Sequence, residues 1–429
     1  MTMAQDPASS GASEDSLTEL MATLRVYGSI LYTTNIWQPR EGTTPIDLEP
    51  AHINGWMKSC AAAGVTTVLW RSNTGWTTYP SKYVPLAGSF ALPPKHRFGT
   101  QEIDQSWQAE DWAFLGEQCN RFDTLALAVE AAHRHGMKIY LDFATFDAIG
   151  VWCNQNYWPQ GGKLAWDPDM WLWSRDQEKR LAGVPCYAEP AVRQLKVREI
   201  DEVTDYDIDG VVVSLVGHMD GTGGDEPCAF GFNPTVVEQY RRRHGVDPLT
   251  GDVDPHKFYA LHGEGFTEFI GGASQVVRGK GRRFIAATRT DGVHGWGGAE
   301  AGKALIGQTM PQRDMRDGQS PLPLAAGFYL ETEKWVEQKL VDALMCAAPY
   351  NDGVNAAKQL RDRLAIPVYL WRKYTAVEGE VYVGAGFDDF RSEVETVRNG
   401  QLDGYAMFLP QITEHPMYTP DWREIYGTR

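Results

Sequence analysis

The chain has 429 residues, and its 15 Trp, 18 Tyr and 16 Phe make 49 aromatic residues. With 43% hydrophobic and 22% charged residues, the composition is that of a globular protein and excludes a disordered or fibrous chain. The formal net charge of −16 repels phosphate backbones and anionic lipids. We therefore expect a neutral ligand, with no nucleic-acid partner and no membrane partner.

Residues 1–23 contain small and acidic residues without an apolar run, which is unlike a secretory signal and predicts a flexible arm. No stretch reaches the roughly 18–20 consecutive apolar residues of a membrane-spanning helix. The six cysteines form no C-x-x-C pair, which is typical of reduced thiols. These features together predict a cytoplasmic protein.

Eight compact apolar runs follow the arm, and helix-length segments separate them. Continuous apolar runs are typical of strands that are buried on both faces of a parallel sheet. In chain order, the predicted strands are residues 24–32, 66–71, 138–143, 210–216, 283–289, 343–348, 367–371 and 404–409.

Amphipathic stretches between these runs predict helices at residues 53–63, 124–135, 191–204, 234–244 and 388–399. Gly64, Gly136 and the Asp-Gly pairs that begin at Asp209 and Asp403 separate helices from the strands that follow. Such glycines between a helix and an apolar run indicate repeated βα units.

Eight βα units predict an α/β fold of the (β/α)8 TIM barrel class, which needs only ~250 residues when it carries no insertions. The extra length falls after strand ends, at residues 72–123, 144–189, 217–233 and 290–328, where long βα loops build the C-terminal face of a barrel. A doubly wound sheet is the alternative arrangement. Since no linker divides residues 24–429, we expect them to form a single barrel domain.

Three segments are distinctive: VPCYAEPAVRQLKVREIDEVTDYDIDG at 184–210, GFNPTVVEQYRRRHGVDP at 231–248 and WVEQKLVD at 335–342. They resemble, in turn, the approach to strand four, the segment after it and the helix before strand six in glycoside-hydrolase-like TIM barrels related to family 10 and to alpha-amylase-like groups. The resemblance implies a catalytic carboxylate at the end of strand four, where this chain has Ser214. Either the carboxylate has moved into the following loop, or the chemistry is not ordinary retaining hydrolysis.

Hydrolysis of a glycosidic bond needs two carboxyl groups, one acting as acid and the other as base or nucleophile. Asp142 ends the third predicted strand, where a barrel carboxylate faces the active site, although a structural hydrogen bond to loop backbone is the alternative. Asp220 and Glu226 follow the fourth strand in a Gly-rich segment and complete the catalytic candidates, unless they belong to a solvated acidic loop. Together with His218 and Asp225 they form a possible divalent-ion site, but such loops are common without metal, so we expect no metal and no cofactor.

The aromatic residues at strand ends suit a saccharide, because the C–H faces of a sugar ring pack on aromatic rings while polar neighbours bind its hydroxyls. Many aromatic residues only pack loops against the barrel. The predicted substrate contacts are Trp70, Arg71, Trp76, His218, Arg289, Asp291, Tyr350, Trp371, Arg372 and Tyr374.

The leading hypothesis is a glycoside hydrolase that acts on a saccharide through paired carboxylates in an aromatic-walled cleft. One alternative is a non-catalytic saccharide-binding barrel, and another is a carbohydrate lyase or isomerase with His218 as base. The saccharide is the expected partner, and the sequence leaves a homo-oligomer open.

Overall fold

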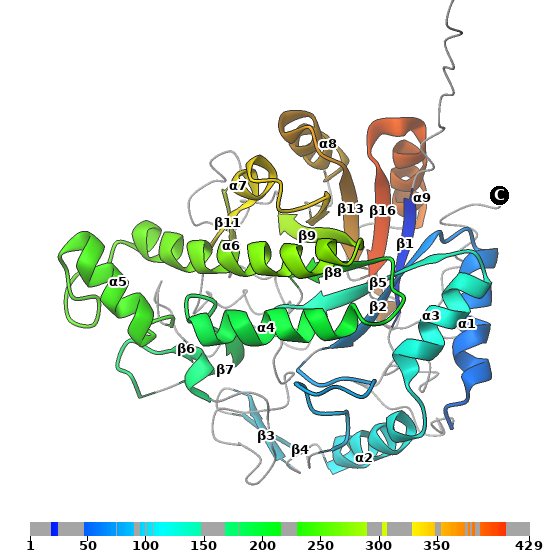
Figure 1. The fold of residues 1–429 in the computed structure, drawn as a ribbon, viewed down its shortest axis with the longest axis horizontal. Helices are drawn as coiled ribbons and strands as arrows, with labels where there is room; N and C mark the ends of the chain where they lie inside the picture. Colours follow the sequence, from blue (N-terminus) through cyan, green and yellow to red (C-terminus); the bar gives the residue numbers. More distant parts are fainter. Residues whose placement is uncertain are drawn as a thin grey trace, which may run out of the picture.

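The computed structural model confirms the predicted TIM barrel and excludes the doubly wound sheet (Figure 1). It describes residues 19–24, 47–73, 75–89, 95–98, 101–104, 106–146, 168–178, 180–215, 230–289, 303–306, 328–347, 353–373, 376–377, 380–381 and 387–408. The parallel strands of the closed barrel are β1 (Glu19–Leu24), β2 (Thr67–Asn73), β5 (Lys138–Ala144), β8 (Gly210–Ser214), β9 (Arg283–Arg289), β12 (Ala343–Ala347), β13 (Val368–Lys373) and β16 (Gly404–Phe408).

The first barrel strand lies earlier in the chain than the predicted range of 24–32. β1 begins at Glu19 and pairs with both β16 and β2, so the arm predicted for residues 1–23 extends five residues too far. β1 is a short strand in which only three apolar residues lie between the buried polar residues Glu19 and Thr23, whereas the prediction followed the apolar run after it. Residues 1–18 and 25–46 lie outside the described part of the chain.

Helices and short hairpins surround the barrel. The predicted helices are found within a few residues of their expected bounds, as α1 (Pro50–Ala62), α3 (Thr124–Arg134), α4 (Pro190–Val203), α5 (Pro234–His244) and α9 (Phe387–Thr396). The helices α2 (Ser106–Arg121), α6 (Pro255–Gly279) and α8 (Gly353–Leu364) were not predicted. α7 (Thr332–Glu337) overlaps the segment at 335–342, for which the resemblance implied a helix before strand six, and the short helical segment η3 (Val397–Gln401) overlaps the end of the helix predicted at 388–399.

The short helical segment η2 (Pro168–Met170) and several antiparallel strand pairs were also not predicted. The pairs are β3 (Lys95–Phe98) with β4 (Gln101–Asp104), β6 (Trp171–Trp173) with β7 (Arg180–Pro185), β10 (Lys303–Ile306) with β11 (Phe328–Glu331), and β14 (Ala376–Val377) with β15 (Glu380–Val381).

The long helix α6 runs beside α4 (Figure 1), and its glycines allow the close approach. A Cβ atom on Gly265 would lie 2.7 Å from the Cα of Ala188, and one on Gly272 would lie 2.9 Å from a methyl group of Val197. Asp254 begins α6 by accepting the backbone N–H of His256 at 3.0 Å. Glycine lowers helix propensity, so tertiary packing outweighs local preference here.

In chain order, every second barrel strand follows a residue whose side chain accepts a hydrogen bond from the backbone of the previous barrel strand. Thr66 Oγ1, before β2, accepts the N–H of Leu20 at 2.9 Å. Asp209, Asp342 and Asp403, before β8, β12 and β16, accept the N–H groups of Ile139, Phe284 and Val368 at 2.8, 2.8 and 2.9 Å. The Asp-Gly pairs therefore help to hold the register of neighbouring strands.

The strand registers arrange the interior side chains in layers drawn from alternate strands, as in other TIM barrels. One layer contains Met21, Tyr140, Ile285 and Tyr369, and the next toward the carboxyl ends contains Leu69, Val212, Met345 and Ala406. Gly404 and Gly210 make room for the tyrosine rings. A Cβ on Gly404 would lie 2.4 Å from Tyr369 Cδ1, and one on Gly210 would lie 3.1 Å from Tyr140 Cδ1.

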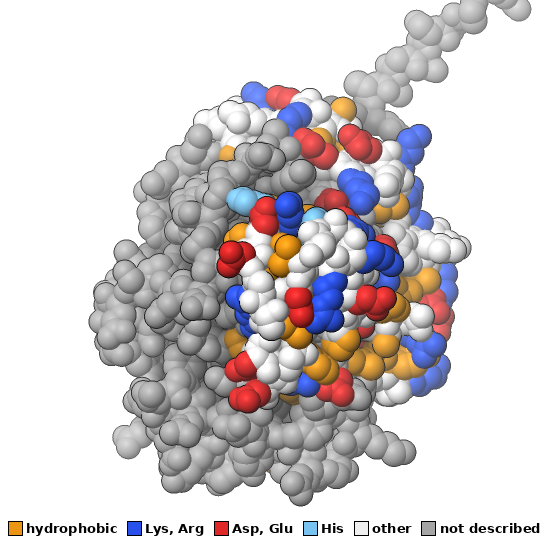
Figure 2. Space-filling model, turned by 90° about the vertical axis from the view of Figure 1, so that its left-hand side faces the viewer, with side chains coloured by type: hydrophobic (Ala, Val, Ile, Leu, Met, Phe, Trp, Pro, Cys, Tyr) orange, Lys and Arg blue, Asp and Glu red, His pale blue; other side chains and the backbone are white. Residues whose placement is uncertain are grey.

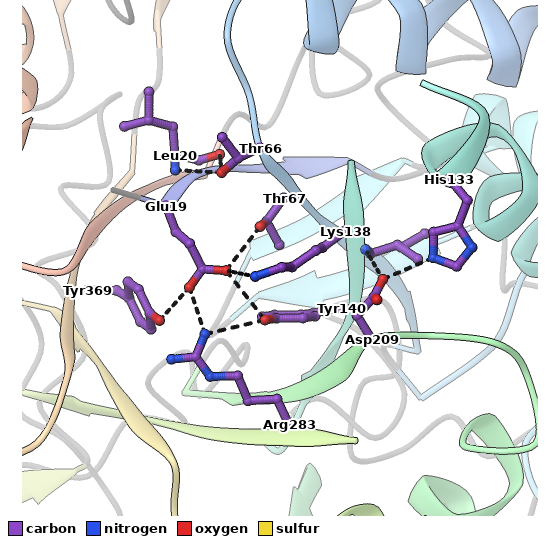
Figure 3. Close-up of polar contacts among 11 residues, drawn as sticks. Glu19, Leu20, Thr66, Thr67, His133, Lys138, Tyr140, Asp209, Arg283 and Tyr369 are labelled. Atoms are coloured by element: carbon purple, nitrogen blue, oxygen red, sulfur yellow. Dashed lines mark hydrogen bonds and ion pairs between the residues drawn. The ribbon is translucent and has the colours of Figure 1, made fainter. Parts of the chain in front are cut away.

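The two tyrosine hydroxyls meet Glu19 at the amino-terminal end of the barrel, in a cluster that we call the floor (Figure 3). Arg283 Nη1 donates to Glu19 Oε2 at 2.7 Å, and Lys138 Nζ donates to Oε1 at 3.0 Å. Tyr369 also donates to Oε2, while Tyr140 and Thr67 donate to Oε1 at 3.4 Å each. A single carboxylate on β1 thus joins β2, β5, β9 and β13.

The charges in the floor decide the protonation of Glu19. Burial by itself would raise the pKa of Glu19, but the hydrogen bond from Tyr369 and the charges of Arg283 and Lys138 outweigh it, so the pKa is lowered. Burial, together with the charge of Glu19, raises the pKa of Tyr140 to about 12. The carboxylate therefore stays charged, and Tyr140 stays a hydrogen-bond donor, near neutral pH.

On the face that carries α5, Figure 2 shows acidic and basic side chains intermixed. The basic residues at the end of α5 fit the negative end of a helix dipole. Two of them also form ion pairs, Arg241 with Asp247 at 2.7 Å and Arg243 with Glu264 at 2.8 Å. Two of the four basic residues at the end of α5 are therefore paired with nearby carboxylates. No helix among the described residues is long and apolar enough to cross a membrane.

Candidate functional site

The interior layer at the carboxyl ends of the strands contains Thr23, Asp142, Ala287 and Trp371, and we call it the mouth layer. In the closed strand order, β5 with Asp142 lies across the barrel from β13 with Trp371, and β1 with Thr23 lies across from β9 with Ala287. The mouth layer is therefore polar on one side and apolar on the other. Carboxyl ends of barrel strands are the usual place for an active site.

Asp142 and Arg71 form a buried ion pair beside Ser214. Arg71 Nη2 lies 2.5 Å from Asp142 Oδ2 and 3.4 Å from Ser214 Oγ, and both charged side chains are only 3% exposed. Arg71 follows the interior residue Leu69 by two positions, and Ser214 follows Val212, so both face inward above the mouth layer. The structure thus brings together two of the predicted site residues.

Two oxygen atoms of the mouth layer have unused hydrogen-bonding capacity. Within the part of the chain that the structure describes, Asp142 Oδ1 and Thr23 Oγ1 are buried and have no hydrogen-bond partner. Leaving a buried polar group unsatisfied costs on the order of 1–3 kcal/mol. Such a cost is expected where a ligand supplies the missing partner, because functional sites commonly sacrifice stability.

The backbone behind Asp142 is tied firmly to the neighbouring strand and loop. Thr145 donates to the carbonyl of Ser214 through its N–H at 3.3 Å and through its hydroxyl at 2.7 Å. The buried hydroxyl of Tyr187 donates to the carbonyl of Thr145 at 2.7 Å. The ring of Tyr187 packs edge-on against Phe266, with the ring centres 5.1 Å apart. These contacts hold the end of β5 in place, as a preorganised site requires.

Trp371 is half-buried and packs against the interior cluster of the barrel, facing the polar side of the mouth layer. Ala287 and Ala406 are small residues of the same interior cluster. An aromatic ring with small neighbours offers an apolar surface opposite the ion pair. The combination can bind a ring that has one apolar face and several hydroxyls.

Three other predicted contacts lie in or against the core between the strands and the helices. Trp70 is fully buried in the core between the strands and the helices, and the half-buried Trp76 packs against that same outer core. Arg372 is 1% exposed and forms two parallel bonds to Glu393 of α9, from Nε at 3.0 Å and from Nη2 at 2.5 Å. Since side chains alternate along a strand, Trp70 and Arg372 face outward where their neighbours Arg71 and Trp371 face inward.

The remaining candidates lie outside the part of the chain whose placement is described. They are Asp220 and Glu226 among the catalytic candidates, and His218, Asp291, Tyr350 and Tyr374 among the substrate contacts. The backbone of Arg289 ends β9, while its side chain is likewise outside the description. These residues stay predictions.

Sequence reasoning missed Thr23, because the first strand was predicted to start at residue 24. With β1 beginning at Glu19, alternation from Met21 would have pointed Thr23 inward. Ser214 was noticed only as a departure from the expected carboxylate, and the structure confirms that a hydroxyl stands at the end of β8. Among the described residues, no group of three or more His, Cys, Asp or Glu side chains could hold a metal ion.

No family model matches this sequence, and no curated protein matches it. Two solved structures illustrate what the fold is similar to. The PgaB glycoside hydrolase domain from Bordetella bronchiseptica is 11% identical, with 91% of this chain and 93% of that chain covered and a TM-score of 0.45. An endo-1,4-beta-mannanase from Rhizomucor miehei is 11% identical, with 89% of each chain covered and a TM-score of 0.42. At this level of similarity, neither activity transfers to this chain.

Proposed function

We propose that the protein is a glycoside hydrolase whose barrel mouth binds a saccharide. The observation that carries the proposal is the buried Arg71–Asp142 pair, in which the carboxylate keeps one oxygen without a partner among the described residues while Trp371 lies across the barrel. A sugar hydroxyl would donate to Asp142, and the apolar face of the ring would pack on Trp371.

Hydrolysis assigns different roles to the two carboxyl groups. Asp142 Oδ2 accepts from Arg71 and Oδ1 has no partner among the described residues, so Asp142 is placed to act as base, nucleophile or hydroxyl acceptor. The proton donor would then come from the segment after β8, where Asp220 and Glu226 are the candidates. Ser214 would contribute a hydroxyl beside the ion pair.

One observation favours the second candidate function, a saccharide-binding barrel without catalysis. The inward position at the end of β8 holds Ser214, so the described part of the mouth contributes a single carboxylate, Asp142. Hydrolysis with two carboxyl groups then depends on a residue outside the described segments. Binding by itself needs only the mouth layer.

Hydrolysis and binding assays with the wild-type protein distinguish the two candidate functions. Hydrolysis is followed with a panel of aryl glycosides and neutral oligosaccharides, and binding is followed by calorimetry. We expect Asp142→Asn to lower kcat/KM by about 10²–10⁴-fold, the range for loss of an acid or base group. Asp362→Asn, on the outer helix α8, is the matched control and should leave kcat/KM unchanged.

Binding without hydrolysis by the wild type would select the second candidate. The proposal for the mouth fails if no glycoside is bound or cleaved, or if folded Asp142→Asn cleaves its substrate as fast as the wild type. Circular dichroism of both variants establishes that they are folded.

A further inference from the structure

We propose, resting on the saccharide function above, that the mouth selects an uncharged sugar and that Thr23 is a specificity-determining residue that binds one of its hydroxyls. Thr23 lies in the same layer as Asp142, one strand removed from it across β2, and its hydroxyl is buried. Neither the resemblance nor the residues at the predicted strand ends indicated Thr23 as a ligand contact.

The charge balance of the described mouth layer favours a neutral ligand. Arg71 and Asp142 neutralise each other at 2.5 Å, and the other mouth-layer side chains, those of Thr23, Ala287 and Trp371, carry no charge. An anionic sugar would need a cation that is not already neutralised, since moving an unpaired charge out of water is costly. The described mouth therefore favours an unmodified sugar over a uronic acid.

The hydrogen-bonding atoms also define the ligand. Asp142 Oδ1 only accepts, so the ligand must donate to it, while the hydroxyl of Thr23 both donates and accepts. A ligand with several hydroxyls satisfies both atoms, because each hydroxyl can donate and accept. A ketone or an ester without hydroxyls would leave Asp142 Oδ1 unsatisfied.

The spacing of the two atoms suits a single sugar ring. β1 and β5 are two strand separations apart, roughly 9–10 Å between backbones, and both side chains point toward the barrel axis. The gap between their tips is therefore shorter than that between the backbones. A ring placed there lies across the barrel from Trp371, on β13, which faces Asp142, on β5.

The test uses Thr23→Val, which keeps the shape and removes the hydroxyl, with Thr23→Ser as the matched control that keeps it. The probes are glucose, galactose, mannose, xylose and N-acetylglucosamine, together with glucuronate and galacturonate, titrated by calorimetry. We expect Thr23→Val to raise the Kd of the tightest-binding neutral sugar about 5- to 10-fold, as loss of one hydrogen bond does. Thr23→Ser should change that Kd by less than about 2-fold. The uronates should bind at least about 10-fold more weakly than their neutral counterparts.

A second readout needs no ligand. Removing a buried hydroxyl that lacks a partner should raise the thermal midpoint of unliganded Thr23→Val, while Thr23→Ser should not gain stability. A lower midpoint for Thr23→Val would contradict the inference, because it would show that the hydroxyl is already satisfied within the protein.

The outcomes distinguish this inference from the function on which it rests. Neutral sugars that bind equally well to wild type and Thr23→Val, or uronates that bind as tightly as neutral sugars, would overturn the inference and leave the saccharide function intact. If the wild type binds none of the probes and none of the glycosides of the hydrolysis panel, both fail.

Discussion

The two ends of the barrel interior each contain a buried carboxylate, and they differ in how many partners each carboxylate has. At the floor, both oxygens of Glu19 accept hydrogen bonds, from two cations and three hydroxyl groups of the surrounding strands. At the mouth, one oxygen of Asp142 accepts from Arg71, and the other has no partner among the described residues.

The contrast shows how one fold separates stability from function. A carboxylate whose partners all belong to the protein is built to hold strands together, as is typical of the amino-terminal face of a TIM barrel. A carboxylate that retains an unused oxygen is built to meet a ligand, at a cost in stability. The apolar layers between the two ends, with Leu69, Val212 and Ile285, keep the two polar sites apart.

The largest expected effect is the loss of the floor carboxylate. Glu19→Gln leaves the cations of Arg283 and Lys138 without their counter-charge, and because both are partly exposed we expect a loss of about 2–3 kcal/mol of unfolding free energy. At the mouth, Thr23→Val removes a buried hydroxyl that has no partner among the described residues, so it should not lower the unfolding free energy. Urea denaturation of both variants measures the difference, and a greater loss for Thr23→Val than for Glu19→Gln would break the comparison.

His262, near the mouth side of α6, should add a pH dependence that the floor does not share. Burial lowers the pKa of His262 to about 4, against the opposing hydrogen bond to the Gly231 carbonyl, so the folded protein holds it neutral. The unfolded chain binds a proton near pH 6.5, so stability should fall by about 2 kcal/mol between pH 7 and pH 5. In His262→Gln, denaturation at the two pH values should show most of this dependence removed, while an unchanged slope would assign it elsewhere.

A methyl group placed against the ring of Tyr369 should disturb the floor and leave the mouth unchanged. Gly404→Ala puts a Cβ 2.4 Å from Tyr369 Cδ1 and 2.5 Å from the Glu19 carbonyl oxygen, and overpacking of this kind should cost about 1–2 kcal/mol. Gly55→Ala is the control, because its Cβ meets nothing within 4 Å in the exposed face of α1, and it should be neutral or stabilising. Saccharide affinity should be unchanged in both variants, and a large loss of affinity in Gly404→Ala would show that the two ends are coupled.

The smallest effect is the acid sensitivity of the floor. Because the pKa of Glu19 is lowered in the folded protein, its stabilising contribution is present above the ordinary carboxyl range and is lost as the pH falls below about 4.5. Glu19→Gln should flatten the stability curve in that range relative to the wild type. The same slope in both proteins, measured by denaturation between pH 5 and pH 3, would contradict this role for Glu19.

Much of the fold could be predicted from local patterns. Seven barrel strands lie where apolar runs predicted them, because a strand with neighbours on both faces must be apolar along its length. Asp142 was placed at a strand end for the same reason. β1 was missed because its six residues include Glu19 and Thr23, whose polarity is compensated only by residues far along the chain.

The sequence by itself determined the repeated βα units and the position of Asp142 at the end of a strand, and it favoured a barrel over a doubly wound sheet, which the closed strand order then excluded. Only the tertiary structure decided which side chains face inward, because both faces of a barrel strand are buried and a shift of one residue reverses every side chain. The structure therefore places Arg71 and Trp371 on the inner face of the barrel and their neighbours Trp70 and Arg372 on the outer face. It also joined Arg71 to Asp142, and Glu19 to Arg283, through strand closure that no local pattern encodes.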